Sequence, residues 1–136
     1  MDTLSAQALE TARLKGAQYA DIRVVHSQHE NISVKDGVVE NMITNESLGL
    51  GVRVLVGGAW GFASSRGMTP AEVDRIVDLA VKIAKASALV RGDPVQLGPP
   101  VTSKGTYTTP IQIDPLRFPS KRNSTCSYKP MPTWRA

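Results

Sequence analysis

Two histidines three residues apart are the first candidates for chemistry in this sequence. His26 and His29 are its only histidines, and Glu30 follows them directly. On a helix this spacing would bring two imidazoles together, whereas on a strand residues three apart point to opposite faces. A turn at Ser27-Gln28 would restore convergence, with Glu30 as a third ligand, and catalytic zinc needs three protein ligands and an open position. We weigh this against ordinary strand and turn residues and predict no metal site here.

Three further features resemble parts of catalytic motifs without completing them. Gly49-Leu50-Gly51-Val52-Arg53 resembles part of a dinucleotide-binding loop, but the third glycine is missing and no helix follows. Ser64-Ser65 lacks the surrounding glycines of a nucleophile elbow. Cys126 is the single cysteine, so an intramolecular disulfide is excluded. It lies in a basic tail where nothing would hold a catalytic base in place beside its thiol. We therefore predict no catalytic residue in this chain.

The stretch Ser47–Ser64 predicts a β-hairpin around which the rest of the chain is organised. Aliphatic side chains occupy every second position of its first half: Leu48, Leu50, Val52, Val54 and Val56. Gly57-Gly58 supplies a two-residue turn, because a type I′ turn needs φ > 0 at both central positions. This turn fixes the register, pairing Val56 with Ala59, Leu55 with Trp60, Val54 with Gly61, Arg53 with Phe62 and Val52 with Ala63.

The two faces of this hairpin differ in composition. Opposite the aliphatic face lie Arg53, Leu55, Trp60 and Phe62, and Arg53 could form a cation–π pair with Phe62. Tryptophan, phenylalanine and arginine are enriched at the centres of protein interfaces. We interpret these four residues as a partner-contact surface, with cover by the rest of the same molecule as the alternative.

The remaining elements predict an α+β fold in which a helix, an antiparallel meander of about five strands and a second helix follow one another. The second helix, Thr69–Val90, begins with a capping box and proline at its first position, and its apolar stripe is the natural cover for the Val52–Val56 face. Its alanines suit a close approach over Gly61 and Ala63. The other expected elements are a helix over Thr3–Lys15, with Gly16 as its stop, and strands over Ala20–Ser27, Glu30–Lys35 and Val38–Thr44, with a turn at Asp36-Gly37.

Composition divides the 136 residues into three parts: a domain over 1–93, a proline-rich connector over 94–118 and an unstructured basic tail over 119–136. All 12 acidic residues but only eleven of the 16 basic ones precede Arg117, so residues 1–116 have a net charge of −1. A nucleic-acid surface is therefore not expected. No apolar run has the length of a membrane span and no signal peptide is visible, which favours a cytoplasmic location.

Several stretches together resemble the N-terminal domain of the TldD/PmbA family: YADIRVV, ENISVKDGVVE, GVRVLVGGAWGFASS, TPAEVDRIVDLAVKIAKASA and GTYTTPIQIDP. The likeness covers roughly residues 5–118, and AWGFASS is closer to the TldD side. It implies a cytoplasmic zinc metallopeptidase that acts on small or unfolded peptides, works as a two-subunit assembly and is also described as a modulator of DNA gyrase.

The resemblance also implies that the chemistry lies elsewhere in the family. The family's zinc site is a helix with His-Glu-x-x-x-His in the larger second part, and that motif is absent here. No catalytic or metal residue is carried over, and we expect no cofactor and no activity in this chain alone. After Pro119 the likeness ends abruptly, which suggests a frameshifted or truncated product. The alternative is a stand-alone binding module that acts through the Arg53/Trp60/Phe62 face or the basic tail.

Overall fold

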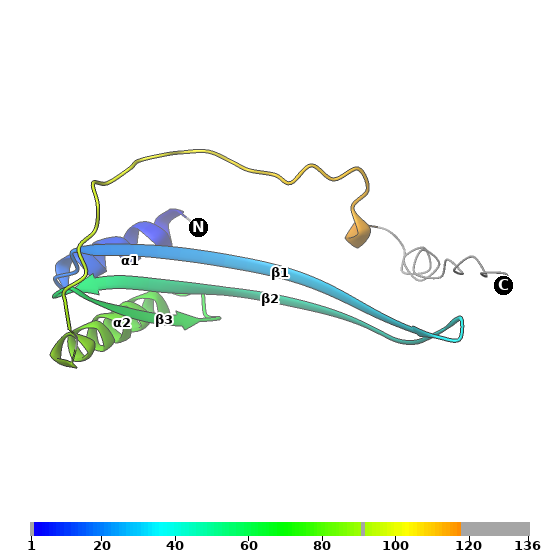
Figure 1. The fold of residues 1–136 in the computed structure, drawn as a ribbon, viewed down its shortest axis with the longest axis horizontal. Coiled ribbons are helices and arrows are strands. Elements are labelled where there is room, and N and C mark those ends of the chain that lie inside the picture. Colours follow the sequence, from blue (N-terminus) through cyan, green and yellow to red (C-terminus); the bar gives the residue numbers. More distant parts are fainter. Residues whose placement is uncertain (1, 91, 118–136) are drawn as a thin grey trace, which may run out of the picture. The chain divides into compact units, whose positions relative to one another are not determined.

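The computed structural model describes residues 2–90 and 92–117. Its elements are α1 (Asp2–Leu14), β1 (Tyr19–Lys35), β2 (Val38–Val56), β3 (Ala59–Ser65), α2 (Pro70–Val90) and the short 3₁₀ helix η1 (Pro115–Arg117) (Figure 1). The chain divides into two compact units, one of residues 1–27 with 47–101 and one of residues 28–46 with 102–136. The predicted unstructured tail, with Cys126, lies outside the described residues. The domain boundaries predicted at 93 and 118 stay predictions.

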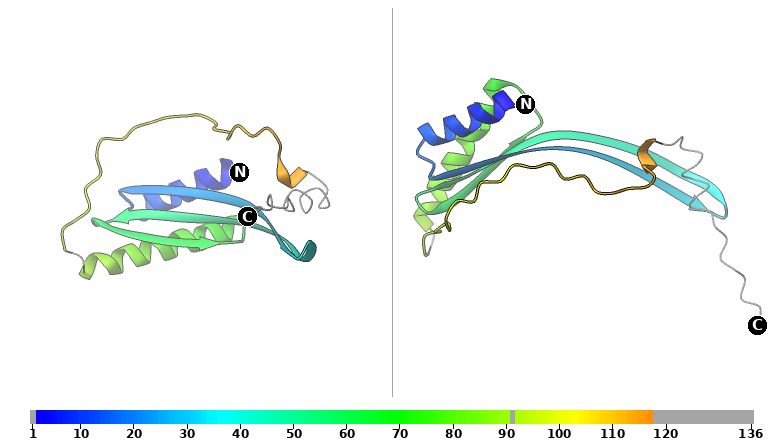
Figure 2. Two further views of the ribbon diagram at one scale, coloured as in Figure 1. Left: turned by 45° about the vertical axis from the view of Figure 1, so that its right-hand side comes forward. Right: turned by 90° about the horizontal axis from the view of Figure 1, so that it is seen from above.

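The first unit is a sheet with two helices on one face. The strand order is β1-β2-β3, and both connections between neighbouring strands are two-residue turns, as antiparallel pairing requires. Both α1 and α2 lie on the same side of this sheet, as the views in Figure 2 show together. The core between sheet and helices consists of small and branched aliphatic side chains: Ala8, Ala12, Leu50, Val52, Val54, Val56, Ala63, Val73, Ile76, Val77, Ala80, Val81 and Ala84. The α+β class is therefore confirmed.

The hairpin of β2 and β3 has the predicted register. Val56 pairs with Ala59 and Val52 with Ala63, and the three pairs between them also match the expectation. Gly57 and Gly58 have φ of 57° and 76°, the left-handed values that a type I′ turn requires. Every second residue of this part of β2 therefore faces the helices.

The helix α1 is fixed to α2 by polar contacts at the edge of the core. The hydroxyl of Thr11 and the amide of Gln7 both donate to the Asp74 carboxylate, at 2.9 Å each. Lys15, just past the helix, pairs with Asp78 at 2.9 Å. Gly16, with φ of 90°, ends the helix: its N–H donates to the Arg13 carbonyl, and the next N–H reaches back to Ala12. This is a Schellman motif, as the predicted glycine stop implies.

The helix α2 lies unusually close to the sheet at Gly61. The hydroxyl of Thr69 caps the helix by accepting from the Glu72 N–H at 3.2 Å. A Cβ atom at position 61 would lie 2.6 Å from the backbone nitrogen of Ala84 and closer still to the Ala80 carbonyl oxygen. Only glycine fits there, and the small residues of α2 let the helix backbone come this near, as the sequence indicated.

The expected number of strands is wrong. Instead of five strands, β1 runs unbroken through Ser27-Gln28, and β2 runs unbroken through Asn45-Glu46. Neither place holds a glycine or proline, so nothing there requires a left-handed or proline-fixed backbone. Their polar side chains are largely exposed, which an extended strand tolerates. The one turn in this stretch is at Asp36-Gly37, where both residues have positive φ, as predicted.

The chain after α2 carries no regular element until η1 within the described residues 92–114. The Val95 N–H donates to the Gly58 carbonyl at 2.9 Å, which ties this segment to the turn between β2 and β3. None of the helices in residues 2–90 and 92–117 is long and apolar enough to cross a membrane.

Replacing Gly61 with alanine is expected to destabilise the domain strongly. The added methyl group meets helix backbone rather than a flexible side chain, so α2 has to move away from the sheet. We expect a loss of at least about 2 kcal/mol in the free energy of unfolding, measured by urea denaturation. Gly98→Ala is the control, since a Cβ atom there meets nothing within 4 Å. A Gly61→Ala variant as stable as this control would show that the close approach does not exist.

Candidate functional site

The candidate site is the face of the sheet that points away from α1 and α2. Alternation along the strands brings three groups of side chains to this open face. They are Tyr19, Asp21, Arg23 and Val25 from β1, Ser47, Arg53 and Leu55 with Gly49 and Gly51 from β2, and Trp60, Phe62 and Ser64 from β3. The four residues predicted as a partner contact therefore share one face.

A compact polar and aromatic cluster occupies one end of the open face. The Arg53 guanidinium donates to the Asp21 carboxylate at 2.6 and 2.8 Å. Its carbon lies 4.7 Å from the ring centre of Trp60, which meets Tyr19 edge to face with 5.8 Å between centroids. The hydrogen bond to Asp21 raises the pKa of Arg53 further, so the cation persists. Arg53 thus lies over Trp60, its diagonal neighbour, and not over Phe62.

The four predicted contact residues differ in how far they are available to a partner. Leu55 is buried, with 3% of its surface exposed, and Arg53 and Trp60 are half-buried in the cluster. Phe62 keeps 58% of its surface exposed. Their role as a contact surface stays a prediction. Phe62, as the most exposed of the four, is the residue that a partner would contact most directly.

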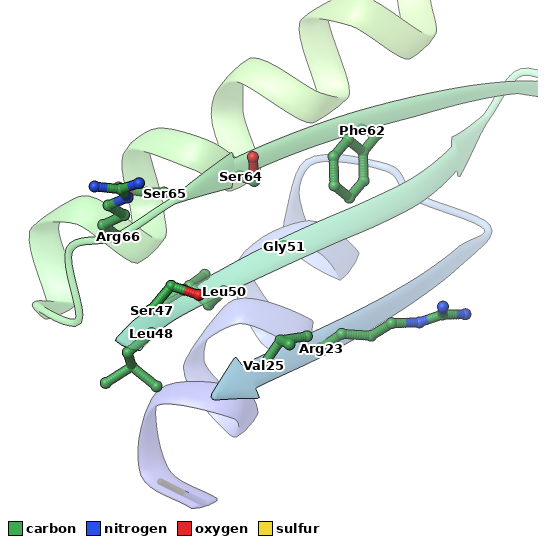
Figure 3. A pocket seen from close by; sticks show the side chains of 11 residues that line it. Arg23, Val25, Ser47, Leu48, Leu50, Gly51, Phe62, Ser64, Ser65 and Arg66 are labelled. Atoms are coloured by element: carbon green, nitrogen blue, oxygen red, sulfur yellow. The ribbon is translucent and has the colours of Figure 1, made fainter. Parts of the chain in front are cut away.

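A groove of about 620 Å³ continues the open face beyond this cluster. Figure 3 shows its lining, with Arg23 and Val25 on β1, Gly51 on β2, and Phe62 and Ser64 on β3. The Phe62 ring lies against Gly51, since a Cβ atom at position 51 would be 2.9 Å from Cε2 of that ring. Aromatic rings commonly cover strand glycines in this way. The sequence analysis placed Phe62 on this face but identified no groove, because it assigned no position on the face to Arg23, Val25 or Ser64.

Ser65, one of the two serines considered as a nucleophile, is part of a structural link between β3 and α2. Its hydroxyl donates to the Glu72 carboxylate and accepts from the Gly67 N–H at 3.1 Å. Arg75 donates to the same carboxylate at 2.7 and 2.9 Å. These hydrogen bonds, first from Arg75 and then from Ser65, lower the pKa of Glu72 to about 2. A carboxylate so weakly basic is unsuited to activate Ser65.

Among the residues that the structure describes, the two histidines do not belong to a metal-ligand set. They lie on β1, which has no turn at Ser27-Gln28 to bring His26 and His29 to one side. Within residues 2–90 and 92–117 there is no group of three or more histidine, cysteine or acidic side chains able to hold a metal ion. The donors that zinc requires are therefore not assembled in the described part of the chain.

Fold and site together define a small α+β domain whose sheet is closed by helices on one face and open on the other. Residues 20–84 match the family model described as PmbA/TldA metallopeptidase domain 1. This chain therefore contains the first domain of the PmbA/TldD family, as the resemblance implied. The matched residues run from β1 to α2, so they include the open face and the helix that closes the other one.

Two relatives named metalloproteases support this assignment. The chain is 35% identical over 74 residues to one from Methanocaldococcus jannaschii, covering 54% of this chain. It is 37% identical over 81 residues to one from Methanothermobacter thermautotrophicus, covering 60% of this chain. Each match spans only 16% of the relative's own length.

A solved structure shares the fold. The crystal structure of TldE from Thermococcus kodakarensis superimposes with a TM-score of 0.59 at 16% identity. The match covers 80% of this chain and 23% of TldE. At this identity the likeness shows the fold alone.

The stability of the domain should fall in acid because two carboxylates have lowered pKa values in the folded state. Glu72 has its pKa lowered from 4.5 to about 2, and Asp78 has its pKa lowered from 3.8 to about 2 by hydrogen bonds from Lys82 and Lys15. A lowered folded-state pKa adds stability above the unfolded value, and this is lost as pH falls toward 2. We expect the Tm to drop between pH 5 and pH 2 in thermal melts followed by circular dichroism.

Matched variants separate these two groups from general acid effects. Glu72→Gln combined with Asp78→Asn should lower the Tm at pH 6 and flatten its fall in acid. Glu40→Gln, an exposed position on β2, should retain the full fall. If the double variant keeps the parent's acid dependence, other carboxylates cause it.

Proposed function

We propose that this chain is the non-catalytic first domain of a TldD-like zinc metallopeptidase, and that it serves assembly or substrate access. The observation that carries the proposal is the family match over residues 20–84. The relatives that share this region are named metalloproteases and are far longer than the matched part. Proteolysis of small or unfolded peptides, in the cytoplasm, is the activity proposed for the whole protein.

The residues of this chain support a role without zinc chemistry of its own. Its two histidines lie three apart, and the sequence has no His-Glu-x-x-x-His. As the resemblance implies, that motif supplies two imidazole ligands for zinc and a glutamate available as general base. The donors present here do not fit zinc, so we assign the metal to the larger second part that the family resemblance implies.

The open face supports a role in contact with another polypeptide. Its exposed Phe62 and neighbouring arginines are of the types that carry binding energy at interfaces. The partner we propose is a second subunit of the TldD/PmbA type. A stand-alone binding module is the second candidate, and the groove beside Phe62 is the observation that favours it.

The isolated 136-residue chain should neither retain zinc nor cleave peptides. After loading with zinc and dialysis, we expect metal well below one ion per chain by elemental analysis. Unfolded casein and short fluorogenic peptides should remain uncut, with or without a chelator. Stoichiometric zinc, or cleavage that a chelator abolishes and that a His26→Ala, His29→Ala variant lacks, would contradict the proposal.

A further inference from the structure

We propose that the groove over Gly49 and Gly51 binds an extended, acidic peptide segment that also carries an apolar side chain. This rests on the proposed function, since it names the chemistry of the partner for the same open face. The groove lies between β1 and β3 and crosses β2 where that strand has no side chains to fill it (Figure 3).

The shape of the groove suits an extended chain. Neighbouring strands lie about 4.8 Å apart, so the side chains of β1 and β3 form two walls roughly 10 Å apart on either side of β2. Gly49 leaves the floor between these walls low, while the Phe62 ring lies against Gly51. A peptide in β conformation presents every second side chain to such a floor, and the Ser64 and Ser47 hydroxyls line the same hollow as hydrogen-bonding groups.

The charge of the groove selects an acidic partner. Arg23 and Arg66 line it, and its lining contains no aspartate or glutamate. Within the described residues no ion pair or hydrogen bond holds Arg66. Arg23 reaches Asp21 only at 3.6 Å, while that carboxylate is held more closely by Arg53. Two exposed guanidinium groups thus remain to bind carboxylates, with which arginine forms strong charge-assisted hydrogen bonds.

Apolar side chains between the two arginines give the groove a second requirement. Phe62 and Val25 are 58% and 57% exposed, and both lie on its walls. Covering them would remove apolar surface from water on both partners. The expected ligand therefore has a branched aliphatic side chain between two carboxylates on one side of an extended chain.

A peptide is favoured over single-stranded nucleic acid. Phosphate binding usually relies on a broad basic surface, whereas the part of the chain before Arg117 carries a net charge of −1. The ring of Trp60, a candidate for base stacking, is already engaged by Arg53 and Tyr19. Tyr19 is 38% exposed but packs against Trp60, so Phe62, 58% exposed, is the ring of the open face most available for stacking.

The test is a titration of the full 136-residue chain, followed by chemical-shift changes of its amide signals. The probe is the blocked peptide Glu-Ser-Val-Ser-Glu, in which both acids and the valine lie on one side when extended. The matched peptides Gln-Ser-Val-Ser-Gln and Lys-Ser-Val-Ser-Lys and a short oligothymidylate are compared with it. We expect saturable shifts around residues 49–51 and 62–66, and roughly tenfold weaker binding of the glutamine peptide.

Protein variants locate the binding. Arg66→Gln and Arg23→Gln should each raise the Kd of the acidic peptide severalfold, whereas Arg13→Gln, an exposed arginine on α1, should leave it unchanged. Equal binding of the glutamine or lysine peptide, tighter binding of oligothymidylate, or no saturable shift would overturn the proposal. The zinc and cleavage assays do not depend on this groove, so either proposal can fail while the other stands.

Discussion

The close approach of α2 to Gly61 is the contact on which the arrangement of this domain depends. Helix backbone lies where any other residue would place its Cβ atom, so α2 is held flat against the Val52–Val56 face. The helix α1 then packs beside α2 on the same face and is fixed there through Asp74 and Asp78. Both helices therefore lie on one side of the sheet, and no helix covers the other side in the part of the chain that the structure describes.

The open face is stabilised by its own side chains at one end only. There, Arg53 pairs with Asp21 and lies over the ring of Trp60. Tyr19 meets the same ring edge to face. Beyond this cluster the two glycines of β2 interrupt the row of side chains, and the groove begins. The groove end of the open face carries exposed arginines and the exposed Phe62, and it is there that we propose the contact with a partner.

Local rules of sequence were enough to predict most of the first unit. The two-glycine turn predicts the register of β2 and β3, and Gly61 with the alanines of α2 indicates the close packing. The predicted strand ends at Ser27 and Thr44 are wrong, because the apolar alternation stops at polar residues there although no residue requires a turn. Hydrophilic runs on a strand exposed to water give no periodicity by which its continuation could be recognised.

The site could be predicted only in part, for a related reason. The residues of one hairpin were placed together correctly, because two strands and a turn share a local register. The partners from β1 could not be placed in this way, because it is the pairing of β1 with β2 that brings Asp21 to Arg53, 32 positions apart in the sequence. The Arg53–Trp60 contact and the groove walls both depend on that non-local pairing. Sequence alone therefore located the face but neither the Arg53–Trp60 cluster nor the groove.

The most direct test of the central claim, that the open face and not the helical face is the contact surface, is an isotope-filtered nuclear Overhauser experiment on the chain saturated with the acidic peptide. We expect cross-peaks from the peptide valine methyl groups to the Phe62 ring and the Val25 methyl groups, and none to α1 or α2. Cross-peaks to residues of α1 or α2, without any to Phe62 or Val25, would contradict the claim that the open face is the contact surface.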